Sequence, residues 1–328
     1  MPYKLMTFKF VFVLFFASCL SNVNPPEAEL VKVPDYPDFY ADNAMYGYDG
    51  KRFFFERSLG QGFNIAYLHE DSSSIVDIDG VSFTPTDISF DDSVLIGFTY
   101  LPEGYIVKYN FMEHKLIELT GPNTLNNKYG GGAAGLRPFI DSSGTLIYYT
   151  MITNRLLNLI GGIVQMDMNG SNWIEILRDE NNRGPSRAKY NRQFNKILAL
   201  DVINIDDKTQ DIIVITYSND FEKESEFNLY EILRKNKIQL SQPIGIDFYD
   251  TDQMLVLLST RELFLINYKT QKTQTFFDLE LGHTIRQLPQ RHPQKENVFL
   301  ITIGNGNNSS IFEYDLNTKT LTNIFSRL

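Results

Sequence analysis

Two neighbouring stretches decide the fold of this chain: residues 137–151, RPFIDSSGTLIYYTM, and residues 161–177, GGIVQMDMNGSNWIEIL. β-Branched and aromatic residues are frequent in both, which favours strands. Ser143-Gly144 is a turn pair, and Asn169-Gly170 is the strongest short-range hairpin signal because both residues tolerate a positive φ. Together the stretches predict four short antiparallel strands, at residues 136–140, 146–150, 163–168 and 173–177.

The same unit recurs, less clearly, along the chain. Its second strand is marked by Phe53, Leu95, Leu146, Ile197, Leu255 and Phe299, which lie between 42 and 58 residues apart. A tandem repeat of about 50 residues with four strands is typical of the blades of a β-propeller. Equal units without a long crossover favour a closed ring over a β-sandwich. We therefore predict an all-β fold, a six-bladed β-propeller of four-stranded antiparallel blades at residues 38–328.

Two further segments have a less regular pattern. Residues 30–33 form a spare strand that we expect to complete the last blade and close the ring, since closure removes unpaired strand edges. Residues 228–235, NLYEILRK, are compatible with a strand or with a short helix. The rest of the predicted ring contains strands and turns only.

The clearest unit resembles a known repeat. Two turn motifs of the TolB-type (WD40-like) repeats are matched by Pro138, Ile140, Asp141, Gly144, Asp167, Asn169, Gly170 and Ser171. The other five units carry weaker versions, in which Asp92, Asn195 or Asp252 replaces a glycine. The resemblance covers residues 38–328 and implies a TolB-like propeller of a Gram-negative cell envelope.

The first residues, MPYKLMTFKFVFVLFFASCLSN, have the layout of a secretory signal: two lysines, an apolar run too short to span a bilayer, then small residues. Phe16-Ala17-Ser18-Cys19 resembles the cleavage box of a bacterial lipoprotein. The resemblance implies a signal peptide at residues 1–18, lipid chains such as palmitate on Cys19, and a tether at residues 19–37. It also implies a lipid-anchored envelope protein, and Leu20 favours the outer membrane. A buried strand with a chance cysteine is the alternative.

The composition excludes several classes of protein. A formal net charge of −10 does not fit nucleic-acid binding, which needs a basic stripe. A single cysteine excludes an intrachain disulfide and a cysteine-built zinc site. The four histidines, His69, His114, His283 and His292, lack metal-ligand spacing, and there is no Gly-x-Ser-x-Gly nucleophile motif. We therefore predict no cofactor, no metal and no enzymatic activity.

Two unusual segments share one face of the predicted propeller. Residues 121–135, GPNTLNNKYGGGAAG, join the second and third units, and residues 153–162, TNRLLNLIGG, form an apolar loop inside the third. Long or apolar loops on a rigid scaffold are typical binding surfaces. The candidate binding residues are Tyr129, Gly130, Gly131, Gly132, Arg137, Asn154, Arg155, Leu156 and Leu157. The alternative is that one loop packs over the other and closes the channel.

These observations predict a non-catalytic envelope lipoprotein whose propeller binds a partner protein through the loop face near blades 2–4. A glycan- or peptide-binding lipoprotein is an alternative, in which Tyr129, Asn126 and Asn127 contact a small ligand. A polysaccharide lyase or glycosidase that uses carboxylates at the channel mouth is a further alternative.

Overall fold

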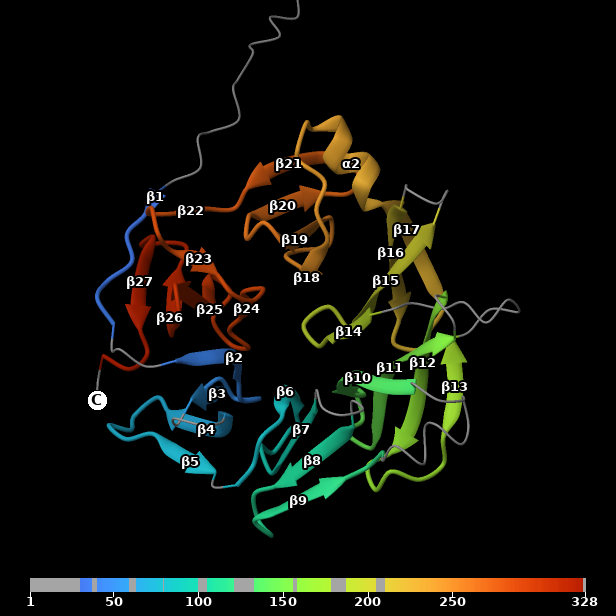
Figure 1. The fold of residues 1–328 in the computed structure, drawn as a ribbon, viewed down its shortest axis with the longest axis vertical. Helices are drawn as coiled ribbons and strands as arrows, with labels where there is room; N and C mark the ends of the chain where they lie inside the picture. The colour runs from blue at the N-terminus through green and yellow to red at the C-terminus, as the bar shows by residue number, and fades with distance from the viewer. Residues whose placement is uncertain are drawn as a thin grey trace, which may run out of the picture.

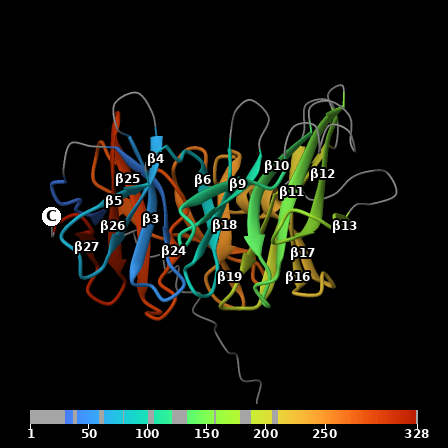
Figure 2. The same cartoon turned by 90° about the horizontal axis from the view of Figure 1, so that it is seen from below.

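Six antiparallel sheets stand around a central channel in the computed structural model (Figure 1). The structure describes residues 30–36, 40–58, 63–78, 80–99, 105–120, 133–155, 158–177, 187–204 and 210–326. Seen from the side, the strands run between the two flat faces of a disc (Figure 2). The predicted all-β, six-bladed propeller is confirmed.

Each blade is one contiguous segment whose first strand lies innermost. Blade 1 contains β2 (Ala41–Tyr46), β3 (Arg52–Ser58), β4 (Phe63–His69) and β5 (Val76–Ile78). Blade 2 contains β6 (Thr84–Ile88), β7 (Val94–Phe98), β8 (Ile106–Asn110) and β9 (Lys115–Glu118). Blade 3 contains β10 (Ala133–Ile140), β11 (Leu146–Arg155), β12 (Asn158–Asp167) and β13 (Ile174–Leu177).

The remaining blades follow the same order. Blade 4 contains β14 (Arg187–Asn191), β15 (Lys196–Asn204), β16 (Gln210–Ser218) and β17 (Lys223–Asn228), followed by the helix α2 (Leu229–Lys235). Blade 5 contains β18 (Pro243–Phe248), β19 (Gln253–Leu258), β20 (Leu263–Asn267) and β21 (Lys272–Thr275). In blade 6 the inner strand is split into β23 (Thr284–Ile285) and β24 (Gln290–Arg291), before β25 (Val298–Asn305), β26 (Asn308–Asp315) and β27 (Thr320–Asn323).

The hydrophobic core is divided among the contacts between blades. Successive strand residues point to opposite sheet faces, so each blade offers an apolar face to both of its neighbours. Phe53 and Phe55 pack toward blade 6, whereas Phe54 between them packs toward blade 2. Six buried clusters result, one at each junction of neighbouring blades, including the junction of blade 6 with blade 1. No blade therefore buries its apolar surface alone.

Hydrogen bonds near the channel also link every pair of neighbouring blades. In order around the ring they are Tyr48 N to Asp92 Oδ1 (2.7 Å), Ile140 N to Asp87 Oδ2 (2.7 Å), Ala188 N to Thr150 Oγ1 (3.0 Å), Arg187 Nη1 to Pro243 O (2.7 Å), Arg291 Nη2 to Tyr249 O (2.5 Å) and Tyr46 N to Gln290 Oε1 (2.9 Å). These bonds hold the inner strands in a fixed register around the axis.

The expected role of residues 30–33 is wrong. β1 (Leu30–Val31) pairs in parallel with β22 (Asp278–Leu279), in the connection between blades 5 and 6. The last blade already has its outer strand from β27, so it offers no place for a further strand there. The ring closes instead through side-chain packing, an isolated parallel bridge between Tyr40 and Ser309, and hydrogen bonds such as that of the Ser309 hydroxyl, which donates to Ala41 O at 2.7 Å.

Two other segments were expected to be a loop or to have an ambiguous secondary structure, namely residues 153–162 and 228–235. The expected loop at residues 153–162 is wrong for its described residues, because 153–155 belong to β11 and 158–162 to β12, and Thr153 pairs with Ile160. Residues 229–235 are helical, and the Asn228 side chain caps the helix by accepting from Glu231 N at 3.0 Å. No helix among the described residues is long and apolar enough to cross a membrane.

Gly97 gives a test of the packing between the first two strands of a blade. A Cβ built at residue 97 would lie 2.1 Å from the Thr84 carbonyl oxygen, which the backbone cannot easily move. We expect Gly97→Ala to lower the free energy of unfolding by roughly 1–3 kcal/mol, as overpacking does. Urea unfolding followed by circular dichroism measures the change. The exposed Ser73→Ala serves as the control, and equal stability of both variants would contradict the packing described here.

Candidate functional site

The channel on the propeller axis encloses a cavity of about 820 Å³ that residues of all six blades line. Its wall is the set of inner strands, and in four blades the pairing of the inner strand is interrupted by a register shift, between Asp42 and Met45, Pro85 and Asp87, Leu136 and Phe139, and Pro243 and Gly245. Such bulges turn side chains out of the regular pleat. Arg137 lies in one of them, with φ of 52°, and lines the cavity.

The charge of the channel wall is opposite to that of the whole chain. Seven basic residues line it, namely Arg137, Arg187, Lys189, Arg192, Arg261, Arg286 and Arg291. Only two acidic residues do so, Asp87 and Asp247. The chain as a whole has 30 lysines and arginines against 40 aspartates and glutamates. The channel is thus a positive cavity in an acidic protein.

Both acidic side chains of the wall are already paired. Asp247 forms an ion pair with Lys189 and accepts from Asn191 Nδ2 at 2.8 Å. Asp87 accepts from Arg192 Nη2 at 2.7 Å and from Ile140 N at 2.7 Å. Burial raises the pKa of Asp87, and the Arg192 guanidinium opposes that rise. These pairs use Lys189 and Arg192, whereas Arg261, Arg286 and Arg291 donate to backbone carbonyl oxygens, which leave their charge in place.

Two arginines face the end of the channel at which the inner strands begin, which we call the connecting face. Arg261 Nη1 donates to Arg286 O at 2.8 Å, and Arg286 donates to Gly306 O. Carbonyl groups position these guanidinium groups but do not neutralise them. Among the described residues neither arginine forms an ion pair with a carboxylate. Arg286 Nε is buried without a hydrogen-bond partner, so the donors that Arg286 can offer to a ligand are those of its Nη groups.

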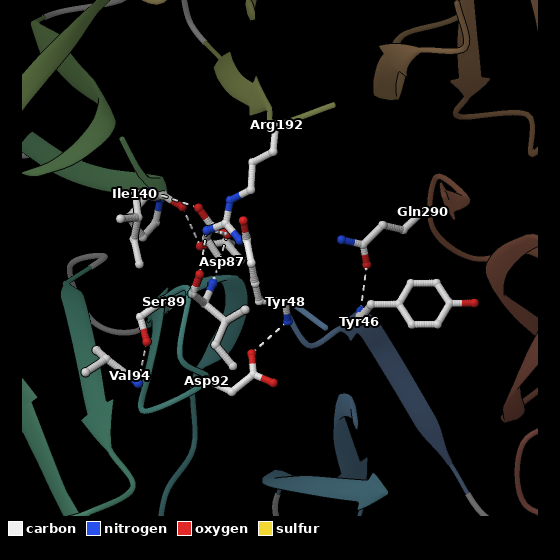
Figure 3. Close-up of polar contacts among 12 residues, drawn as sticks. Tyr46, Tyr48, Asp87, Ser89, Asp92, Val94, Ile140, Arg192 and Gln290 are labelled. Atoms are coloured by element: carbon white, nitrogen blue, oxygen red, sulfur yellow. Dashed lines mark hydrogen bonds and ion pairs between the residues drawn. The ribbon is translucent and has the colours of Figure 1, made fainter. Parts of the chain in front are cut away.

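Arg192 occupies the opposite end, which we call the turn face because the inner strands turn back there. The side chain leaves the first turn of blade 4 and reaches Asp87 on blade 2, where it also donates to Ile88 O (Figure 3). Its Cζ lies 5.3 Å from the ring centroid of Tyr48 and 5.2 Å from that of Phe90, which suits cation–π contacts. One side chain of blade 4 therefore contacts blades 1 and 2 at this end.

His292 lies beside the turn face and is neutral. Its side chain is buried, with 4% exposed, and packs on Tyr46 at a ring separation of 4.7 Å. Its Nδ1 accepts from Gln294 N at 3.0 Å and from Lys295 N at 3.1 Å. Burial, assisted by Lys295, lowers the pKa of His292 to about 4. The ring also fills the space against Gly50, where a Cβ would lie 2.4 Å from Cε1.

Among the described residues no group of three or more histidine, cysteine, aspartate or glutamate side chains is placed to hold a metal ion.

The structure separates the candidate residues predicted from the sequence. Arg137 lines the channel. Asn154 and Arg155 lie in the β11–β12 hairpin, where Asn154 pairs with Leu159 and Arg155 with Asn158. Outside the described residues lie Cys19, Asn126, Asn127, Tyr129, Gly130, Gly131, Gly132, Leu156 and Leu157.

Sequence analysis missed most of the channel's basic residues. Arg187 and Lys189 lie on β14, the innermost strand of blade 4. Arg261 of blade 5 and Arg286 of blade 6 lie at the connecting face of the channel. The available signal was a basic residue at or near the innermost strand in several units, because every innermost strand faces the same axis.

Comparisons with known proteins give the fold and no assignment by sequence. No protein-family model and no curated protein matches this chain. The structure is similar to an oligogalacturonate lyase from Vibrio parahaemolyticus, with 10% identity, 86% of this chain and 79% of that chain covered, and a TM-score of 0.54. It is also similar to a chain of a nidogen/laminin complex, with 13% identity, coverage of 79% and 88%, and a TM-score of 0.50.

A putative TolB from Agrobacterium tumefaciens is a further match, with 14% identity and a TM-score of 0.44 over 57% of this chain and 66% of that chain. At the level of the fold, the expectation of a TolB-like six-bladed β-propeller is confirmed.

The predicted function is wrong. We expected a non-catalytic protein that binds a partner protein through the loop face near blades 2–4. Oligogalacturonate lyases share the fold, so a propeller of this kind does not imply a non-catalytic protein. A propeller within a complex of two proteins shares it as well. The fold therefore assigns neither role.

His292 predicts a specific dependence of stability on pH. Because its pKa is near 4 in the folded chain and 6.5 in a free histidine, the unfolded chain binds the proton more tightly. The His292 contribution is complete above about pH 6.5 and is lost as the pH falls toward 4, by at most on the order of 3 kcal/mol. In His292→Asn, whose side-chain oxygen replaces the Nδ1 acceptor, this loss should disappear.

The measurement is urea unfolding of both proteins at several pH values between 4 and 7. Only the difference between variant and wild type is used, because buried carboxyl groups such as Asp87 also titrate. Parallel curves for the two proteins would show that His292 takes up its proton equally in the folded and unfolded chains.

Proposed function

We propose that the central channel binds an acidic oligosaccharide, a short sugar chain that carries carboxylates. The observation that carries this proposal is the charge reversal of the channel wall, which has seven basic and two acidic residues in a chain of net charge −10. A chain of net negative charge repels such a ligand, whereas the basic residues of the channel wall attract it. Charge thus supports both the choice of ligand and the place where it binds.

Arginine chemistry supports a carboxylate as the group that is recognised. A guanidinium group has five N–H donors in a fixed planar fork that matches two carboxylate oxygens. Arg261 and Arg286 each donate a hydrogen bond to a backbone carbonyl, which fixes the orientation of the guanidinium fork and leaves further donors. A neutral sugar would leave these charges without a counterion in the cavity.

The cavity size and the fold support an oligosaccharide as the carrier of the carboxylates. A volume of about 820 Å³ lies within the usual range of ligand pockets, roughly 300–1,000 Å³. The wall combines basic, amide and aromatic side chains, which is suited to a polar ligand with flat faces. The Vibrio parahaemolyticus protein of the same fold is an oligogalacturonate lyase, which acts on a saccharide of this kind.

Charge removal at the connecting face tests the proposal. We expect Arg261→Gln and Arg286→Gln each to weaken binding of trigalacturonate by about 10–100-fold, because each loses a charged hydrogen bond to a carboxylate. Isothermal titration calorimetry on the purified propeller measures the affinities. Lys272→Gln on the outer strand β21 is the matched control, and neutral maltotriose should not bind. Equal affinity of all three variants, or binding of maltotriose with the same strength, would refute the proposal.

The same samples separate binding from turnover. Elimination from a uronate chain produces an unsaturated sugar that absorbs ultraviolet light, whereas binding alone produces no such signal. An increase in absorbance that depends on the protein would make the channel an active site, and its absence would leave a binding site.

We also propose that Cys19 anchors the chain in the outer membrane of a Gram-negative envelope. The support is the sequence alone, in which the only cysteine follows a signal-like apolar run. In Cys19→Ala cells, incorporation of radioactive palmitate into the protein should be lost, and the protein should move from the membrane fraction to the soluble one. Cys19→Ser should behave identically. Unchanged labelling would show that the lipid is not on Cys19.

A further inference from the structure

Arg192 spans the channel from one side to the other at the turn face. It belongs to blade 4, and the ring of Tyr48 on which its guanidinium group lies belongs to blade 1, at 5.3 Å. In a ring of six, blades 4 and 1 are opposite each other. The close-up in Figure 3 shows the Arg192 side chain directed away from its own blade toward Asp87 and Tyr48. The guanidinium group therefore crosses this end of the channel.

Its partners on the far side are themselves fixed. Asp87 accepts from Ile88 N at 2.9 Å and from Ile140 N at 2.7 Å. Backbone groups of blades 2 and 3 therefore orient its carboxylate independently of Arg192. Tyr48 N donates to Asp92 Oδ1 at 2.7 Å, which holds the Tyr48 segment in place. Arg192 therefore binds to two groups, the Asp87 carboxylate and the Tyr48 ring, whose segments other hydrogen bonds already hold in place.

Blades 5 and 6 contribute the rest of this end. Arg291 donates to Tyr249 O at 2.5 Å, and its Cζ lies 4.9 Å from the Tyr249 centroid and 5.3 Å from that of Phe299. The buried His292 follows it. At the connecting face, the hydrogen bonds of Arg261 and Arg286 stay within the neighbouring blades 5 and 6. The two ends of the channel thus differ.

We infer that the channel is a pit with Arg192 as part of its floor, and that it takes the end of an acidic oligosaccharide rather than an internal stretch of one. The inference rests on the proposed function. The ligand enters at the connecting face, where Arg261 and Arg286 meet its carboxylates, and its terminal sugar stops at the floor. A chain that threads through would have to separate Arg192 from Asp87 and from both aromatic rings. Arg192 is thus a specificity residue that selects chain ends.

Chain length separates end binding from internal binding. An end binder has one site per chain, so its affinity per mole of chain should stay within about twofold once the pit is filled. An internal binder gains overlapping sites as chains lengthen, and its affinity per chain rises with length. Calorimetry with galacturonate oligomers from three to about twelve sugars distinguishes these outcomes. A steady rise with length in the wild type would overturn the inference, whereas no binding at any length would refute the proposed function instead.

End capping gives a second test on the unaltered protein. A bulky fluorophore is coupled either to the reducing end or to the opposite end of the same oligomer, and a third sample carries both. We expect the doubly capped oligomer and at least one singly capped form to lose affinity by about tenfold or more, since the pit has no exit for the cap. If the doubly capped oligomer binds with the same affinity as the uncapped oligomer, the protein does not recognise chain ends.

Arg192→Ala opens the floor. Its affinity per chain should rise with oligomer length, and it should tolerate one of the caps, because a chain can now pass through the ring. Arg234→Ala is the matched control, since it removes another ion-paired arginine of blade 4, held by Asp211 at 2.8 Å on the outside of the ring. If Arg192→Ala shows the same length series and cap sensitivity as the control, Arg192 does not select chain ends.

Discussion

The structure depends on the closure of six blades into a ring, because no blade can bury its apolar faces without two neighbours. The buried clusters lie between blades, and the one between blades 6 and 1 has the same character as the other five. Side-chain packing, the isolated backbone bridge between Tyr40 and Ser309 and a few hydrogen bonds make that last junction. The innermost strand of each blade keeps a free edge, and closure protects these edges by turning them toward the channel.

Closure also explains why polar chemistry gathers on the axis. The spaces between blades are filled with apolar side chains, whereas the six inner strands leave a cavity on the axis whose wall also contains charged side chains. Buried charges need partners, and the wall supplies them through Lys189 with Asp247 and Arg192 with Asp87. The wall has more basic than acidic residues, whereas the chain as a whole has a net charge of −10.

The sequence predicted the fold because each unit carries its own strand and turn signals, such as Asn169-Gly170 between β12 and β13. It could not predict the channel, since Arg187, Arg261 and Arg286 come from distant units and converge only after the ring closes. Glycine and leucine content predicted binding loops at residues 121–135 and 153–162. In the second segment, the described residues belong to the paired strands β11 and β12. Residues 30–33 carry a strand signal, but pairing partners are set by the tertiary structure.

A crystal structure with a short galacturonate oligomer tests the central claim most directly. The account predicts the sugar on the propeller axis, with a carboxylate within hydrogen-bond distance of Arg261 or Arg286 and the terminal ring above an intact Arg192–Asp87 pair. Sugar bound only outside the ring, for example at the β11–β12 hairpin, with the channel free of it, would contradict the account.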